Sequence, residues 1–374
     1  MNSISSASSG AVQGRDHGKA APSLPARLGP GLLLCAALAA ASMWLAGIGP
    51  LQRSGISALT IAIVLGIVAG NTVYGRIAPV GAAGVGWSKQ YLLRFGIILY
   101  GFRLTFQDIG HIGAAGVVID VLVVASTFAL SWLAGVRLFR LQREDAMLIG
   151  AGSAICGAAA VMAAQSVVRG RAEQVTVAVS TVVAFGTAAM FLYPVMLELN
   201  AQWGWIPLSA AQSGLYIGST VHEVAQVAAA AASLGSSVAD TAVITKMVRV
   251  MLLAPFLMVL AATLCRRPGA GHAHGADGES VLAQVWQAMP WFALGFIAAA
   301  GVNSLHVLPA PAVAVLDQTC TVALAMAMAA LGLSTHVSAL RRAGKKPLLL
   351  AALLFAWLIV GGGAIGLGVT ALMG

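Results

Sequence analysis

Two basic side chains lie three residues apart inside an apolar segment. Lys246 and Arg249 occur in ITKMVR (244–249), near the middle of an apolar run over 238–265. Residues three apart share one face of a helix. A basic side chain deep in a bilayer costs about 2.5–3.5 kcal/mol on insertion scales, so it is usually paired or lines a watery cavity. We therefore predict that Lys246 and Arg249 bind an anionic substrate as its counter-charge.

A second polar group lies in VHEVAQV (221–227). Glu223 and Gln226 are spaced i, i+3 and His222 and Gln226 i, i+4, so on a helix all three converge on one patch. His222 with Glu223 is a candidate proton relay, and Gln226 a substrate ligand. The alternative is an internal ion pair of Glu223 with one of the two basic residues above. The motif lacks the second histidine of a zinc protease.

A third group is the glycine-rich stretch GAGSAICG (150–157). If the helix breaks here, free backbone N–H groups at the start of the second half would suit an anion. Gly152, Ser153, Cys156 and Gly157 are then candidate substrate-binding residues. The alternative is a face of small residues for close packing of helices.

Four further charged residues interrupt apolar runs, and we assign them structural or gating roles. Arg94 and Arg103 can reach the two membrane surfaces with their long side chains. Asp120 can pair with Arg103 across a hairpin. Asp317 can reach the central site or act structurally, and the sequence leaves both open.

The sequence predicts neither a metal site nor a cofactor. The four cysteines form no CxxC pair. His272 and His274 share a polar loop without further fixed ligands, which is a weak metal signal. The net charge of +9 is spread over short loops rather than a basic stripe with aromatic residues, so we expect no nucleic-acid partner.

The composition places the chain in a membrane. Hydrophobic residues make up 59% and charged residues 9%, against roughly 25% charged in a soluble domain. We predict an all-α polytopic protein with about eleven transmembrane helices. Residues 1–28 would form a disordered cytoplasmic tail and 29–52 an extra N-terminal helix that is retained, or else a cleaved signal peptide. The other spans are predicted near 56–71, 90–107, 112–136, 145–167, 173–197, 206–232, 238–265, 284–306, 311–335 and 347–371.

The distribution of basic residues predicts the orientation. With the N-terminus inside, 14 of the 21 Lys and Arg residues fall in inner segments and three in outer loops. This bias predicts a cytoplasmic N-terminus and a periplasmic C-terminus. Similar features recur about five spans apart, which is an odd number and is therefore consistent with inverted repeats over 53–200 and 201–374.

Four stretches together carry a family resemblance: LLRFGIILYGFRLTF (92–106), GAGSAICGAAA (150–160), VHEVAQV (221–227) and TKMVRVMLLAP (245–255). They resemble the YeiH-like family of proposed sulfate exporters, conserved bacterial inner-membrane proteins. The resemblance implies a fold of the sodium/proton antiporter and bile-acid symporter type, with two inverted five-helix repeats and a pair of broken, crossing helices. The broken helices would be the fifth and tenth spans, 145–167 and 311–335.

These observations favour a secondary transporter that exports a small, sulfate-like anion by alternating access. Protons or sodium would be the coupling ion, and a homo-oligomer is compatible with the sequence. A cation/proton antiporter on the same scaffold is the alternative, although no span holds an adjacent Asp-Asp pair. An intramembrane enzyme using His222 and Glu223 is a third hypothesis, but no nucleophile–base pattern accompanies these residues. We therefore do not expect an enzyme.

Overall fold

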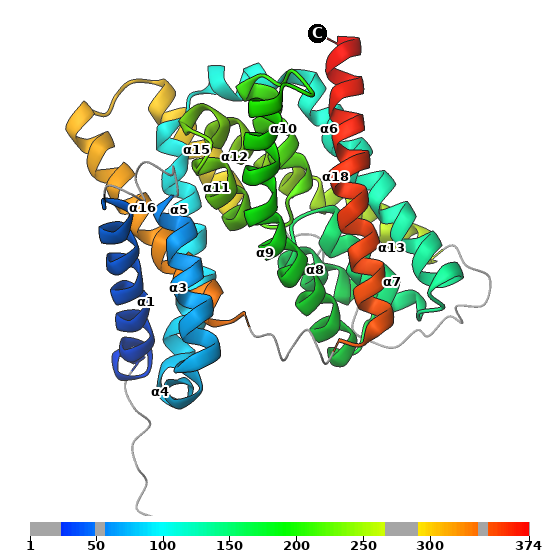
Figure 1. Ribbon diagram of the computed structural model, residues 1–374, viewed down its shortest axis with the longest axis horizontal. Helices are drawn as coiled ribbons and strands as arrows, with labels where there is room; N and C mark the ends of the chain where they lie inside the picture. Colours follow the sequence, from blue (N-terminus) through cyan, green and yellow to red (C-terminus); the bar gives the residue numbers. More distant parts are fainter. Residues whose placement is uncertain (1–23, 49–56, 266–290, 336–342, 374) are drawn as a thin grey trace, which may run out of the picture.

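The computed structural model describes residues 24–48, 57–265, 291–335 and 343–373, and every regular element in them is helical (Figure 1). Helices suit a bilayer because each satisfies its own backbone polar groups. Short π and 3₁₀ segments also occur: η1 (Ser88–Leu92), η2 (Gly101–Arg103) and η3 (Ala134–Leu138). The α-helices are α1 (Leu24–Ala46), α3 (Ala58–Thr72), α4 (Tyr74–Trp87), α5 (Leu93–Tyr100), α6 (Phe106–Leu133), α7 (Arg143–Ala154), α8 (Ala158–Val168), α9 (Ala172–Trp203), α10 (Ala210–Thr220), α11 (Val224–Ala232), α12 (Ser236–Met251), α13 (Leu253–Cys265), α15 (Trp291–Ser304), α16 (Ala310–Leu333) and α18 (Lys345–Met373).

Six helical segments of the described residues are long and apolar enough to cross a membrane, which confirms the predicted class. They are Arg27–Ala46, Gly113–Leu138, Ala172–Trp203, Ser236–Leu264, Ala310–Leu333 and Lys345–Met373. Shorter apolar helices cover Ala58–Thr72, Ala158–Val168 and Trp291–Ser304. The total of eleven spans, the inverted repeats and their boundaries stay predictions.

The N-terminal region differs from the sequence prediction in two places. Residues 1–23 of the predicted tail lie outside the described residues, and α1 begins at Leu24 rather than after residue 28. The segment before the predicted 90–107 span is helical from Tyr74 onward, since α4 runs directly into η1 and α5. Small residues in α4 let it pack closely against α1, and this tertiary contact was not visible in the hydropathy.

The helices form two groups that lie side by side in Figure 1. The first group contains α1, α3, α4, α5, α15 and α16, with its closest packing between α3 and α16. The second contains α6 to α13 and α18, with close packing of α10 on α12 and of α6 on α7. Weaker contacts of α11 with α3 and α16 join the two groups. Each group therefore draws on segments far apart in the sequence.

Two of the predicted spans, 145–167 and 206–232, are broken near their middle, and both belong to the second group. One break separates α7 from α8 at Ile155–Gly157, as predicted for the glycine-rich stretch. The other separates α10 from α11 at Val221–Glu223. Because Lys246 Nζ donates both to the Ile155 carbonyl (2.8 Å) and to the Val221 carbonyl (2.6 Å), the two breaks lie next to each other.

The prediction that the tenth span is broken is wrong. α16 runs without interruption from Ala310 to Leu333. Asp317, Thr319 and Thr321 lie inside α16 without breaking it, whereas Glu223 and Gln226 form a capping box at the start of α11. Such a box satisfies backbone N–H groups that a helix start leaves free. The second break therefore falls in the seventh predicted span, 206–232.

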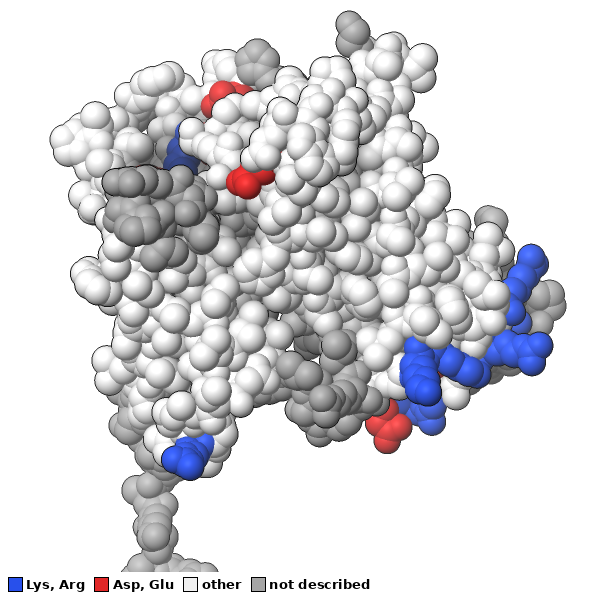
Figure 2. Space-filling view, viewed as in Figure 1, with Lys and Arg blue, Asp and Glu red and all other residues white. Residues whose placement is uncertain are grey.

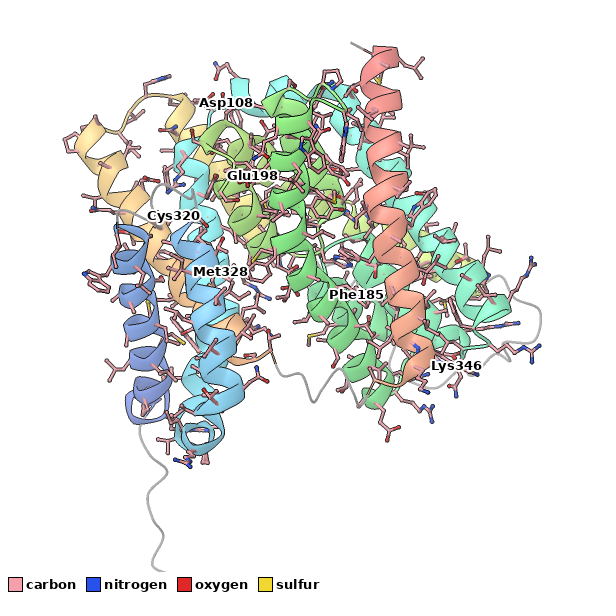
Figure 3. All side chains as sticks on the ribbon, in the orientation of Figure 1. Asp108, Phe185, Glu198, Cys320, Met328 and Lys346 are labelled. Carbon is pink, nitrogen blue, oxygen red and sulfur yellow. The ribbon has the colours of Figure 1, made fainter. Side chains whose placement is uncertain are left out.

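Charged side chains separate between the two ends of the molecule. Figure 2 shows most of the Lys and Arg side chains at the lower end, where α18 begins. Asp108 and Glu198 lie near the upper end and Lys346 near the lower end (Figure 3). Between these ends the visible surface is almost free of charge, as a surface that faces hydrocarbon requires.

Candidate functional site

Lys246 and Arg249 bind the C-terminal ends of two half-helices. Both side chains are fully buried on one face of α12. Arg249 Nε donates to the Ala154 carbonyl (2.7 Å) and its Nη2 to the Ser153 carbonyl (3.0 Å), both at the end of α7. Its Nη1 donates to the Ser219 carbonyl near the end of α10. Lys246 completes the set with the carbonyls within the two breaks.

These contacts explain how two cations are tolerated in an apolar core. The last carbonyls of a helix have no partner within it, and together they carry about half a negative charge. Breaking two helices at one place brings two such ends together. Lys246 and Arg249 satisfy these carbonyls and compensate their charge. In this conformation the donors seen here are directed at the backbone, so a direct contact of either side chain with an anion stays a prediction.

The N-terminal ends of α8 and α11 hold a carboxylate. Glu223 is the N-cap residue of α11, and Gln226 Oε1 accepts from the backbone N–H of Glu223 at 3.1 Å. Oε1 of Glu223 accepts from the backbone N–H of Ala158, the first residue of α8, at 3.3 Å. One half-buried carboxylate therefore lies where two positive helix ends meet.

The other predicted residues of this region lie at the same breaks. Gln226 is fully buried, and its Nε2 has no hydrogen-bond partner among the described residues. His222 is buried between α10 and α11, and its Nδ1 likewise has no hydrogen-bond partner within the described ranges. Cys156 is a buried free thiol in the first break. Ser153 contributes its carbonyl to Arg249, and the Gly152 carbonyl accepts from the N–H of Gly157 at 2.9 Å.

Gly157 has a backbone conformation that residues with a side chain rarely adopt. Its φ of 74° and ψ of −137° lie outside the regions open to L-residues. A Cβ at this position would overlap with Cγ of Glu223. The sequence therefore needs glycine here both for the turn into α8 and for the approach of the capping carboxylate.

Substituting Gly157 with alanine is expected to lower the free energy of unfolding by about 1–3 kcal/mol from backbone strain, with a further loss from the displaced Glu223. The measurement is thermal unfolding of the detergent-purified protein. Gly366→Ala in α18 is the control, because a Cβ there meets open space. Equal melting temperatures for the two variants would contradict this account of Gly157.

The pairing of Arg103 with Asp120 predicted from the sequence is wrong. Arg103 forms a salt bridge with Asp317 of α16, and its Nη2 donates to Thr321 Oγ1 at 2.9 Å. Asp120 is instead fully buried in α6 and interacts electrostatically with Arg249 and Lys246. Arg103 and Asp120 are close in the sequence, but their side chains face different helices. Arg94 is exposed on α5, and its reach to a membrane surface stays a prediction.

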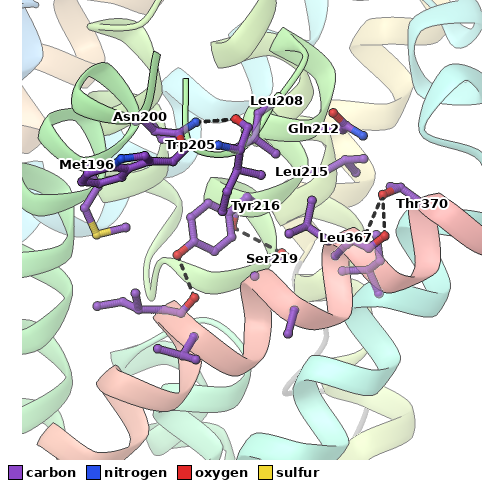
Figure 4. Close-up of a pocket in the computed structure, with 18 residues that line it drawn as sticks. Met196, Asn200, Trp205, Leu208, Gln212, Leu215, Tyr216, Ser219, Leu367 and Thr370 are labelled. Atoms are coloured by element: carbon purple, nitrogen blue, oxygen red, sulfur yellow. Dashed lines mark hydrogen bonds between the residues drawn. The ribbon is translucent and has the colours of Figure 1, made fainter. Parts of the chain in front are cut away.

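A cavity of about 440 Å³ lies next to the breaks, between α9, α10 and the C-terminal half of α18 (Figure 4). Its lining is mostly apolar, and Tyr216 in its wall donates to the Ile359 carbonyl at 2.8 Å. Ser219, whose carbonyl accepts from Arg249, is part of the wall. So is Ile119, which precedes Asp120. The cavity thus lies towards the end of the molecule where α18 terminates, and its wall includes two residues adjacent to the buried charges.

Sequence reasoning missed two features of this region. The i, i+3 spacing of Glu223 and Gln226 was interpreted as a shared helix face, but it is a capping box that marks a helix start. The hydrogen bond from the Tyr100 hydroxyl to Asp240 Oδ1 (2.9 Å), which joins α5 to α12, was also missed. No sequence signal indicates a contact between residues so far apart.

Comparison with known proteins identifies the family. The family model described as "Conserved hypothetical protein 698" matches residues 30–351. A UPF0324 membrane protein of Pseudomonas aeruginosa is 60% identical over 337 residues, which cover 90% of this chain and 93% of that one. The chain belongs to the UPF0324 membrane protein family. This confirms the YeiH-like resemblance seen in the four sequence stretches.

Two further UPF0324 relatives have similar coverage. The UPF0324 inner membrane protein YeiH of Escherichia coli (strain K12) is 53% identical over 336 residues, covering 90% of this chain and 93% of the relative. A UPF0324 membrane protein of Yersinia pestis is 50% identical over 338 residues, with coverage of 90% and 92%. No solved structure matches the chain.

Proposed function

We propose that this UPF0324 protein is a secondary transporter that exports small oxyanions of the sulfate class by alternating access. The substrate would bind where the N-terminal ends of α8 and α11 meet. Protons are the coupling ion in this proposal, and no enzymatic step is part of it.

The position of Glu223 carries the proposal. Its carboxylate accepts the first backbone N–H of α8, and Glu223 is also the N-cap residue of α11, so the carboxylate lies where two helix N-termini meet. A small oxyanion presents the same kind of acceptor oxygens, and helix N-termini bind such groups well. The unpartnered Nε2 of Gln226 at the same helix end offers a further donor. Glu223 would therefore occupy the site when the substrate is absent and leave it when protonated.

Proton coupling in this proposal is assigned to Glu223 rather than to His222, because exchange with the substrate anion requires the carboxylate to leave the two helix ends. A proton on His222 would add a third positive charge near Lys246 and Arg249, which already interact with this imidazole. A proton on Glu223 instead removes a negative charge from the anion site. Lys246 and Arg249 would assist the substrate through their positive potential while they remain bound to the α7 and α10 carbonyls.

Broken helices that meet near the middle of a membrane protein are typical of substrate sites in secondary transporters. The names of the relatives favour the inner membrane as the location. The gathering of Lys and Arg at one end of the molecule (Figure 2) favours that end as the cytoplasmic one. The C-terminus of α18, at the opposite end, would then be periplasmic.

Flux measurements in liposomes test the proposal. Purified protein is reconstituted, the vesicles are loaded with labelled sulfate, and efflux is followed with and without a pH gradient. We expect saturable, sulfate-selective efflux that a pH gradient changes and that protein-free vesicles lack. Sodium efflux that does not depend on anions would instead support the cation/proton antiporter. If the protein transports none of a panel of small anions and no sodium, the proposal is overturned.

A further inference from the structure

Asp120 is an ionisable group that the proposed substrate site does not use. It lies in the middle of α6 with no exposed surface. Among the described residues, neither of its carboxylate oxygens has a hydrogen-bond partner. A buried carboxylate without hydrogen bonds is costly in its charged form, unless nearby positive charges compensate it.

The compensating charges are those of α12. Lys246 and Arg249 carry two positive charges, while the C-terminal ends of α7 and α10 together supply only about one negative charge. Asp120 interacts with both cations and supplies the missing negative charge. The carboxylate therefore balances the region when ionised, and a proton on it leaves one positive charge in excess.

The Glu223 carboxylate also interacts with Lys246, but the N-terminal ends of α8 and α11 beside it supply about one positive charge that balances it. α6 packs against α7, α10, α12, α15 and α18 and continues into η3. α15 carries no charged residue, and Tyr216 of α10 donates to a backbone carbonyl. His222, in the break after α10, also interacts with the two cations. The remaining ionisable residues lie towards the ends of their helices: Arg137, Arg143, Glu144, Asp145, Asp240, Lys345 and Lys346.

A proton suits Asp120 better than a metal cation does. The described residues contain no group of three His, Cys, Asp or Glu side chains that could hold a metal ion. A metal cation would also need several oxygen ligands, and neither carboxylate oxygen of Asp120 has a polar partner among the described residues. A proton requires no further ligand, and the cavity of Figure 4 approaches this region through Ile119 and Ser219.

We propose that Asp120 is a second proton-binding site, and that its protonation creates the excess positive charge that favours binding of the substrate anion. The first part stands on the burial and surroundings of Asp120. The second part rests on the proposed anion transport. Because binding linkage is reciprocal, anion binding must then raise the affinity of Asp120 for its proton by the same factor.

Infrared difference spectroscopy tests the proton site without any substrate. The spectrum of the reconstituted protein at acidic pH minus that at alkaline pH should contain the C=O stretch of a protonated, non-hydrogen-bonded carboxylic acid. Asp120→Asn should lack this band, and Asp120→Glu should retain it at a shifted position. Asp108→Asn, an exposed carboxylate at the start of the same helix, is the control and should keep it. An unchanged band in folded Asp120→Asn would overturn the assignment.

Calorimetry of sulfate binding tests the coupling. In wild-type protein the dissociation constant should rise on the order of tenfold from acidic to neutral pH, and proton uptake should make the observed binding enthalpy depend on the ionisation enthalpy of the buffer. Asp120→Asn should lose a large part of both effects. If both persist in full, the coupling is wrong. An Asp120-dependent infrared band without sulfate binding by the wild type would leave the proton site standing and overturn the proposed transport instead.

Discussion

Replacing Arg249 with methionine is expected to lower the free energy of unfolding by about 3–5 kcal/mol, the range for breaking a buried ion pair by removing one partner. The variant would lose three hydrogen bonds to the ends of α7 and α10. It would also leave Asp120 with Lys246 as its nearest compensating charge. Denaturant-induced unfolding of the purified protein, followed by tryptophan fluorescence, measures the loss.

Arg94→Met is the matched control, because this arginine is exposed on α5. It should change stability by less than about 1 kcal/mol. The double variant Arg249→Met, Asp120→Asn should be more stable than the sum of the single effects predicts, since the neutral amide no longer needs a compensating charge. Strict additivity of the two substitutions would show that Asp120 and Arg249 are not coupled.

The second large effect is expected from Glu223→Gln. The amide is neutral and cannot act as a competing anion at the N-termini of α8 and α11. We expect sulfate to bind on the order of tenfold more tightly at neutral pH, which corresponds to about 1.4 kcal/mol. Sulfate efflux driven by a pH gradient should fall at the same time, because the group that exchanges with the substrate no longer takes up a proton.

Equilibrium binding and liposome efflux give the two readouts for this variant. Glu198→Gln is the control, since Glu198 is an exposed carboxylate towards the upper end of the molecule in Figure 3. Wild-type affinity and wild-type proton coupling in Glu223→Gln would show that the carboxylate does not occupy the anion site. Weaker binding in Glu223→Gln would indicate that Glu223 only caps α11.

Local sequence patterns accounted for part of the candidate site. The break in the glycine-rich stretch lies in the fifth span, as the family resemblance implied, and Gly157 supplies the positive φ of its turn. The spacing of Lys246 and Arg249 correctly placed both on one helix face. The prediction for the second break names the wrong span, because a capping box formed by Glu and Gln has the same residue spacing as a polar patch on one face of a helix.

The pairing of charges was beyond reach of the sequence. Arg103 has Asp120 close by in the chain, yet its partner is Asp317, 214 residues away. Helical periodicity tells which residues share a face, but it does not tell which other helix that face meets. The sequence gives no signal for the carbonyls that bind Lys246 and Arg249, since every residue has a backbone carbonyl.

The amino-acid sequence alone determined that this is a membrane protein whose helices are apolar over most of their length. It also determined which few polar residues these helices carry. These properties follow from composition and local spacing. The tertiary structure decided that two interrupted helices meet, so that their C-terminal ends bind cations and their N-terminal ends bind a carboxylate. Exposed backbone at a helix end becomes a binding group only when folding brings a partner to it, and that depends on contacts across the whole chain.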